Sequence, residues 1–176
     1  IAGNAYHVLM HEIGHLIIDQ LRLAILGQEE DAADNFATIA LIDEDTAFAD
    51  NALANTAHFW FVLSDEQGSD ASNYFAEHDL DIQRAYRIVC HLVGVDAEAF
   101  GYLAEAAELS EDNYETCGAN FEQTADSWFS TLDAYKPDEG FQNQVDLVYQ
   151  EPEPQYEAAL SLLRDSLIVE DAIAFI

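Results

Sequence analysis

Residues 3–26 read GNAYHVLMHEIGHLIIDQLRLAIL, and this stretch decides how the chain begins to fold. Apolar side chains recur here every three or four positions, which predicts an amphipathic helix with one buried side. These apolar positions are Leu9, Ile13, Leu16, Ile17 and Leu21. Gly27 follows directly, and glycine is common just past the end of a helix. We therefore expect one helix over residues 3–26 that stops at Gly27.

Most of the remaining chain is also predicted to be helical. The expected helices span residues 29–42, 46–63, 79–93, 97–108, 111–135 and 155–168. Residues 144–149 alternate polar and apolar side chains and are the one convincing strand candidate. The chain has 176 residues, half of them hydrophobic, which is enough for one domain with a core. We expect a single, compact, mainly α domain over residues 1–176, with at most a small β element near residues 143–150.

The chain is strongly acidic. It has 35 aspartates and glutamates against five lysines and arginines, and a formal net charge of −30. Nucleic acids and anionic membranes carry the same sign of charge, so we do not expect them as partners. No apolar run approaches the roughly 20 residues that a membrane span needs. The composition indicates a heavily hydrated surface and leaves the oligomeric state open.

His11-Glu12-Ile13-Gly14-His15 is an HExxH motif inside the first predicted helix. His11 and His15 are four residues apart, so they share one helix face and both imidazoles can reach a single metal ion. A zinc ion with three protein ligands keeps a position for water and makes that water more acidic. Glu12 lies beside His11, where its carboxylate can take the water's proton and pass it to a leaving amine. The motif therefore predicts a zinc site with Glu12 as its catalytic base and acid.

Gly14 lies in the middle of this helix, where glycine costs about 1 kcal/mol relative to alanine. The close approach of another backbone would explain why a glycine is kept there. Ala32 and Ala33, in the next predicted helix, are small enough to allow such packing. We expect the two helices to be in close contact at Gly14.

Residues 28–34, QEEDAAD, place four acidic side chains at the start of the second predicted helix. The helix dipole favours acidic residues there but does not explain their spacing. Glu30 and Asp34 are four apart, so one can bind zinc while the other accepts a hydrogen bond from a ligand histidine. Glu29 is the rival ligand, but the residue four positions later is Ala33, which offers no acceptor. We therefore predict that Glu30 and Asp34 share these two roles, one as the third zinc ligand and the other as the partner of a histidine.

Two further residues are candidates for stabilising an oxyanion. His78 and Arg84 lie six residues apart across a predicted junction between a loop and a helix. Hydrolysis of an amide at such a zinc site passes through a tetrahedral intermediate whose oxyanion needs a donor, and either side chain could serve. The alternative for Arg84 is a structural ion pair with an acid. His7, four residues before His11, is interpreted as an outer neighbour of the site or as solvated.

The spacing of His11, Glu12 and His15 and of Glu30 and Asp34 resembles that of the gluzincins. These zinc peptidases have HExxH followed by a glutamate ligand in an ExxxD pattern on the next helix. The resemblance implies one Zn²⁺ per chain, held by His11, His15 and Glu30, with Asp34 as the hydrogen-bond partner of a ligand histidine.

A closer similarity, over residues 5–135, is to a bacterial family of predicted metallopeptidases of unknown function. It is carried by residues 11–37, the stretch FAEHDLDIQR at residues 75–84, and then Cys90, Cys117 and Trp128. The two cysteines of this family are consistent with a disulfide and an exported location, although the residues alone leave the pairing open. Residues 141–168 resemble a segment that the family carries before the zinc helix. Residues 141–176 are therefore interpreted as a rearranged or partial second copy.

The leading hypothesis is a zinc-dependent peptidase acting on a peptide or protein substrate. The alternative is a non-catalytic zinc-binding module for structure or interaction, because few strands are predicted and such peptidases lay their substrate along an edge strand. A zinc site acting on a non-peptide amide or ester is a third possibility that the residues do not separate from the first.

Overall fold

The first helix, α1 (Ala2–Leu21), is shorter than predicted. The structure is a computed structural model that describes residues 2–67, 74 and 76–136. At the end of α1, Arg22 adopts a left-handed backbone conformation with φ of 53°, and Leu23 N–H donates to the Ile18 carbonyl at 3.0 Å. This hydrogen bond is typical of a helix that ends with a left-handed residue. The prediction that Gly27 ends the helix is wrong, because the chain turns five residues earlier.

Packing explains the early turn. Leu23 and Ile25 both pack against a buried cluster made by Ile18, Phe36 and Trp128. The contact of these two partly buried aliphatic side chains offsets the roughly 1–2 kcal/mol that a left-handed arginine costs.

Five more helices follow in the described part of the chain. They are α2 (Glu29–Asp43), α3 (Ala47–Gln67), α4 (Asp81–Val95), α5 (Ala97–Ala106) and α6 (Glu111–Asp133). Side chains at several helix starts accept hydrogen bonds from backbone N–H groups, among them Thr46 for α3, Asp96 for α5 and Ser110 for α6. The described residues contain helices and no strand, which confirms the mainly α class. The predicted strand at residues 144–149 and helix at residues 155–168 lie outside the described residues.

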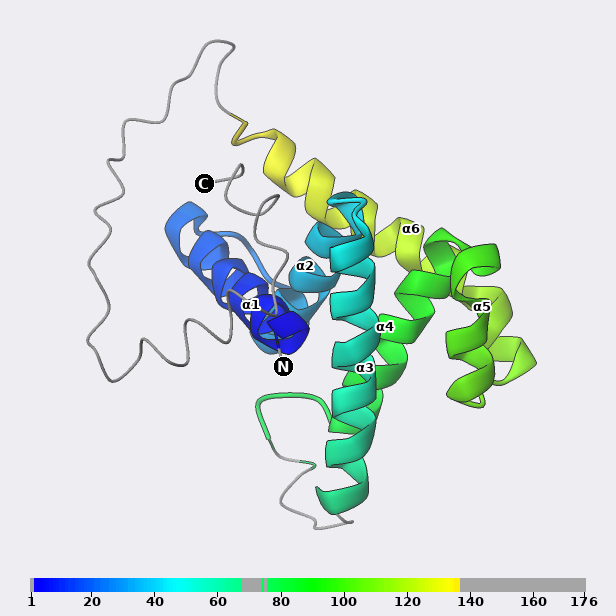
Figure 1. Ribbon diagram of the computed structural model, residues 1–176. Helices are drawn as coiled ribbons and strands as arrows, with labels where there is room; N and C mark the ends of the chain where they lie inside the picture. Colours follow the sequence, from blue (N-terminus) through cyan, green and yellow to red (C-terminus); the bar gives the residue numbers. More distant parts are fainter. Residues whose placement is uncertain (1, 68–73, 75, 137–176) are drawn as a thin grey trace, which may run out of the picture. The chain divides into compact units, whose positions relative to one another are not determined.

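Helix α4 is the centre of the arrangement of residues Gly3–Ala134, which form one compact unit. It packs against α2, α3, α5 and α6, and it lies along α3 in Figure 1. Its buried residues contribute to a core that also takes side chains from α2, α3 and α6. The main members are Leu41, Leu53, Ile88, Val89, Leu92, Val93 and Cys117. None of the described helices is both long and apolar enough to cross a membrane.

A disulfide between Cys90 and Cys117 joins α4 to α6, with Cα atoms 4.9 Å apart. The two backbones also approach closely one turn further along α4. A Cβ atom on Gly94 would lie 2.5 Å from the carbonyl oxygen of Cys117. Glycine is needed at this position because a side chain would collide with backbone atoms of α6.

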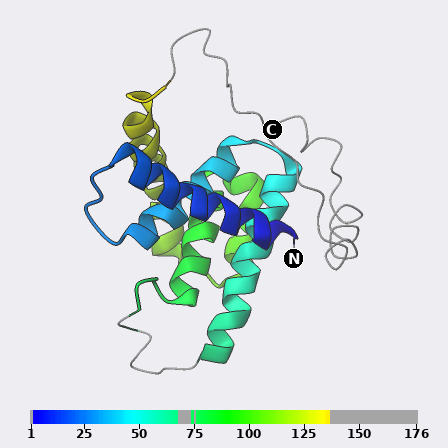
Figure 2. The same cartoon turned by 90° about the vertical axis from the view of Figure 1, so that its left-hand side faces the viewer.

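Helix α1 crosses the other helices instead of running along them, as Figure 2 shows. Its contact with α2 is made at Gly14, where an added Cβ atom would lie 3.1 Å from the Ala33 Cα atom. The predicted close contact at Gly14 is confirmed. It brings the HExxH turn of α1 against the first turns of α2, so the fold places the two halves of the candidate site side by side.

Candidate metal centre

Three side-chain atoms from α1 and α2 converge on one point. The Nε2 atoms of His11 and His15 lie 3.1 Å apart, and each lies 3.2 Å from the Oε2 atom of Glu30. A tetrahedral zinc ion bound at its usual distances holds neighbouring nitrogen and oxygen ligands about 3.3 Å apart. The spacing of these three atoms therefore suits a zinc ion between them.

The other ring nitrogens of the two histidines face carboxylates. His11 Nδ1 lies 2.8 Å from Asp34 Oδ1, and His15 Nδ1 lies 2.9 Å from Glu29 Oε1. When each Nδ1–H donates to its carboxylate, Nε2 carries the lone pair that a metal needs. Both histidines thus have the orientation of metal ligands.

Glu29 was not expected to take part in this way. Glu29 was rejected as a zinc ligand because Ala33, four residues later, cannot accept a hydrogen bond from a ligand histidine. In the structure, Glu29 itself is the acceptor, for His15, while its neighbour Glu30 points to the metal position. Successive helical residues point about 100° apart, so two adjacent glutamates can contact opposite sides of one histidine. The sequence feature that could have indicated this role of Glu29 is the presence of two adjacent glutamates, Glu29 and Glu30, at the start of a helix.

Asp34 connects His11 to Arg84. The Arg84 Nε and Nη2 atoms donate to the two carboxylate oxygens of Asp34 at 2.6 and 2.7 Å. Arg84 also lies over the ring of Trp60, with its guanidinium carbon 3.8 Å from the ring centroid. Burial alone would raise the pKa of Asp34, but the hydrogen bonds and charges of His11 and Arg84 outweigh it and hold that pKa below its usual value. Asp34 therefore stays ionised and keeps accepting from His11.

An open cavity of about 620 Å³ borders the convergence point. It is lined by His11, Glu12, His15, Gln28, Glu29, Glu30, Glu77 and His78. Arg84 does not line this cavity, because its guanidinium is buried against Asp34 and Trp60. The structure therefore brings His78 and Glu12 to the same opening and places Arg84 behind the ligands.

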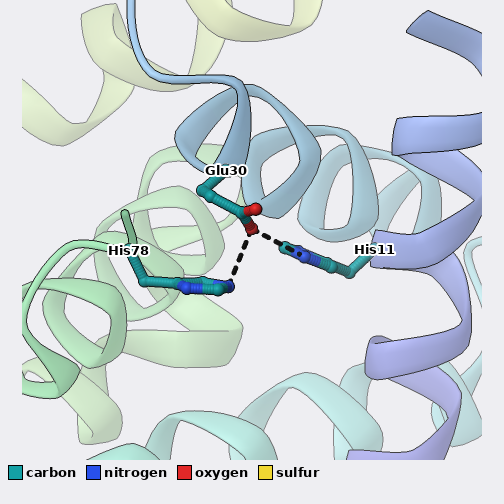
Figure 3. A group of neighbouring side chains, drawn as sticks. All are labelled: His11, Glu30 and His78. Atoms are coloured by element: carbon teal, nitrogen blue, oxygen red, sulfur yellow. Dashed lines mark ion pairs between the residues drawn. The ribbon is translucent and has the colours of Figure 1, made fainter. Parts of the chain in front are cut away.

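His78 approaches the metal position from the segment before α4. Its Nε2 atom lies 2.7 Å from Glu30 Oε2, and its ring stacks on that of His11 with centroids 5.8 Å apart (Figure 3). The ligand atoms of His11, Glu30 and His78 all lie within 4.8 Å of one another, so these three could also hold a metal ion. His78 can thus serve either as a hydrogen-bond donor at the site or as a further ligand.

His7 lies one turn before His11 but is not solvated. It is 1% exposed, and its Nε2 atom is 3.4 Å from Thr38 Oγ1. Burial, aided by the nearby Arg84 and His11, lowers its pKa to about 4, against the opposing charge of Asp34. Of the two interpretations of His7, the solvated one is wrong.

A family model with the description "Putative metallopeptidase" matches residues 1–132 of the chain. The chain belongs to this family, DUF4344. The matched region contains the HExxH helix, the acidic start of α2, His78 and α4. No match to the chain was found among curated proteins or among solved structures. Membership of DUF4344 supports a metal-dependent peptidase at the level of the family's description, and the choice of metal and the chemistry must be argued from the residues.

Proposed function

We propose that this DUF4344 member is a zinc-dependent peptidase in which Glu12 is the general base and acid. One observation carries the proposal: two histidine nitrogens and one glutamate oxygen converge to within 3.1–3.2 Å of one another beside Glu12 in an open cavity. Two imidazoles and one carboxylate are the ligands of many catalytic zinc sites. The site holds one ion per chain in this proposal.

The chain's own residues then have separate tasks. His11, His15 and Glu30 hold the ion, which when bound supplies a Lewis acid for the scissile carbonyl and a more acidic water. Glu12 accepts a proton from water in the cavity and delivers it to the leaving amine. Asp34 and Glu29 keep the two imidazoles in the tautomer that leaves Nε2 free for the ion.

His78 is the better candidate for stabilising the oxyanion. It lines the cavity, its side chain is 44% exposed, and its Nε2 atom already faces the metal position. Arg84 is buried and its Nε and Nη2 atoms both donate to Asp34, so we assign it to positioning His11 through Asp34. This role matches the alternative of an ion pair with an acid.

Helix α1 offers an apolar surface on both sides of Glu12. Val8, Leu9 and Leu16 are each about half exposed, and they lie one turn before or after Glu12 along the same helix. Residues three or four apart share a helix face. Apolar side chains of a peptide could rest on this surface while its backbone reaches Glu12, which supports a peptide or protein as the substrate.

The contact between His78 and Glu30 also favours a second candidate function. If His78 bound the ion together with His11, His15 and Glu30, four protein ligands would fill a tetrahedral site. A closed site of this kind is structural, because no position remains for water. The second candidate is therefore a non-catalytic zinc module for structure or interaction.

Variants of Glu12 and His78 separate the two candidates. For a peptidase, purified protein should hold about one zinc ion and cleave a peptide library. Glu12→Gln should then abolish cleavage and keep the zinc, while the matched change Glu77→Gln at the cavity wall keeps both. His78→Ala should lower kcat without loss of zinc. A closed site predicts instead that the wild type cleaves no peptide and that His78→Ala weakens zinc binding strongly. Equal cleavage by the wild type and by Glu12→Gln would refute the peptidase proposal.

An exported location is also part of the proposal. The Cys90–Cys117 disulfide is consistent with an oxidising compartment, since disulfides persist there and are rare in the cytosol. Mass spectrometry of the protein isolated from its native compartment would detect the bond as the loss of two hydrogens.

A further inference from the structure

Two arginines on α4 reach two aspartates on α2. Arg84 and Arg87 are three residues apart, as are Asp31 and Asp34, so each pair lies on one side of its helix. Arg84 binds Asp34, and Arg87 binds Asp31 with its Nη1 atom 3.2 Å from Asp31 Oδ1. The whole chain has only five basic residues against 35 acidic ones. The use of two of them in one contact between helices indicates a specific role.

Arg87 makes a second ion pair that Arg84 does not match. Its Nη2 atom donates to Asp79 Oδ2, in the segment just before α4. One guanidinium therefore joins the first turn of α2 to this segment. Asp31 directly follows Glu30, and Asp79 directly follows His78. Both arms of Arg87 end one residue away from the His78–Glu30 contact of 2.7 Å.

This bridge matters because His78 lies outside any helix. Residues 76–80 have no regular secondary structure, and the side chain of His78 is 44% exposed, so neither a helix nor burial fixes its position. The Arg87 side chain, by contrast, is 28% exposed, and those of Asp31 and Asp79 are 29% and 19% exposed. Partly buried, two-armed ion pairs hold their groups better than the exposed single pairs that contribute little.

We infer that Arg87 is a positioning residue that holds His78 over Glu30 by binding Asp31 and Asp79 together. The inference deepens the proposed function: any effect of Arg87 on catalysis through His78 rests on the peptidase proposal. The position of His78 itself does not depend on that function and can be measured directly.

The first test follows the His78 side chain in zinc-loaded protein labelled with ¹⁵N-histidine. Its imidazole signals are assigned by their loss in His78→Gln. Arg87→Met, which keeps an unbranched side chain without the charge, should move the His78 signals toward those of a free imidazole. The signals of His11, whose ring stacks on that of His78, and of His15 should change less. Arg87→Lys should not restore them, because a lysine cannot bridge two carboxylates with a rigid fork. Arg22→Met, at an exposed arginine, is the control and should change nothing. Unchanged His78 signals in Arg87→Met would overturn the inference.

The second test is a double-mutant cycle on peptide cleavage. Loss of one oxyanion donor typically lowers kcat by about 10²–10³-fold. Arg87→Met should lower kcat by a similar factor with KM and zinc content little changed, and should lower it little further in the His78→Ala background. If the losses in kcat from the two single changes instead multiply in the double variant, a role of Arg87 through His78 is contradicted.

If Arg87→Met does not fold, Asp79→Asn removes one arm of the bridge and should give the same change in the His78 signals. If no variant or wild type cleaves peptides, the proposed function fails while the NMR result still decides the role of Arg87.

Discussion

Arg84 and Asp34 are joined by two parallel hydrogen bonds of 2.6 and 2.7 Å, and both side chains are almost fully buried. Paired hydrogen bonds of this kind fix the carboxylate in its plane as well as its position. The same carboxylate accepts from His11 at 2.8 Å. Helix α4, which contains no predicted metal ligand, therefore orients the first histidine of the metal centre.

Asp34→Asn should weaken both zinc binding and the fold. The amide cannot pair with the charge of Arg84, and removing one partner of a buried ion pair typically costs about 3–5 kcal/mol. Loss of a carboxylate behind a ligand histidine typically lowers metal affinity by about 10–100-fold. Competition with a zinc chelator and urea unfolding measure the two effects.

Asp43→Asn, at the exposed end of the same helix, is the matched control and should change neither quantity. Combining Asp34→Asn with Arg84→Met should restore part of the lost stability, because no unpaired charge remains buried. Wild-type zinc affinity in Asp34→Asn would show that Asp34 does not orient His11.

Glu29→Gln should also weaken zinc binding, but less than Asp34→Asn. Glu29 accepts from His15 Nδ1 at 2.9 Å, and its side chain is 53% exposed, so water can replace part of its effect. We expect a loss in affinity of about tenfold or less. Glu77→Gln changes the charge of the same cavity wall equally and should have no comparable effect. Equal losses in both variants would mean that only the net charge of the cavity matters.

The part of the site that the sequence predicts well depends on helix periodicity. The four-residue spacings of His11 with His15 and of Glu30 with Asp34 determine which side chains share a face, whatever the helices pack against. The directions of Glu29 and Arg84 and the approach of His78 depend on how α1, α2 and α4 pack together. A single sequence carries no direct signal for that packing, so it left Arg84 open between an oxyanion donor and an ion pair with an acid, and the packing decides for the ion pair with Asp34.

The fold shows the same division. Gly14 marked a close helix contact in advance, since a glycine in a helix interior has a cost that such packing explains. The end of α1 was misplaced because Arg22, not Gly27, takes the left-handed conformation. The cause is the burial of Leu23 and Ile25 on side chains from α2 and α6, which lie far away in sequence.

Acid should destabilise the protein partly through His91. This residue is 3% exposed, and burial, with a smaller effect from the charge of Arg87, lowers its pKa from 6.5 to about 4. The folded state then binds fewer protons than the unfolded state, so stability is greatest above about pH 6.5 and falls as the pH drops toward 4. One such group contributes about 2 kcal/mol to the loss between pH 7 and pH 5. His7, whose pKa is also lowered to about 4, acts in the same direction.

His91→Gln should reduce this dependence on pH. Glutamine does not titrate and can still reach Asn35, which lies 3.4 Å from His91 Nε2. Urea unfolding of zinc-free protein at pH 7 and pH 5 should show a difference smaller by about 2 kcal/mol than in the wild type. The exposed His58 provides the control, since His58→Gln should leave the difference unchanged. A full wild-type difference in His91→Gln would show that His91 is already protonated in the fold or exposed to water.

Two glycines in neighbouring helices should respond in opposite ways to alanine. Gly94→Ala places a Cβ atom 2.5 Å from the Cys117 carbonyl oxygen and 2.9 Å from its carbonyl carbon. The backbone of α6 cannot easily move away, because the disulfide at Cys117 ties it to α4 one turn earlier, at Cys90. Overpacking of this kind typically costs about 1–3 kcal/mol, which exceeds the roughly 1 kcal/mol that alanine gains over glycine in a helix. Gly101→Ala in α5 meets nothing within 4 Å, so it should stabilise the protein by up to that amount. Thermal unfolding should therefore give a lower Tm for Gly94→Ala and a higher Tm for Gly101→Ala. A higher Tm in both variants would mean that helix propensity, and not the contact between α4 and α6, decides the stability at Gly94.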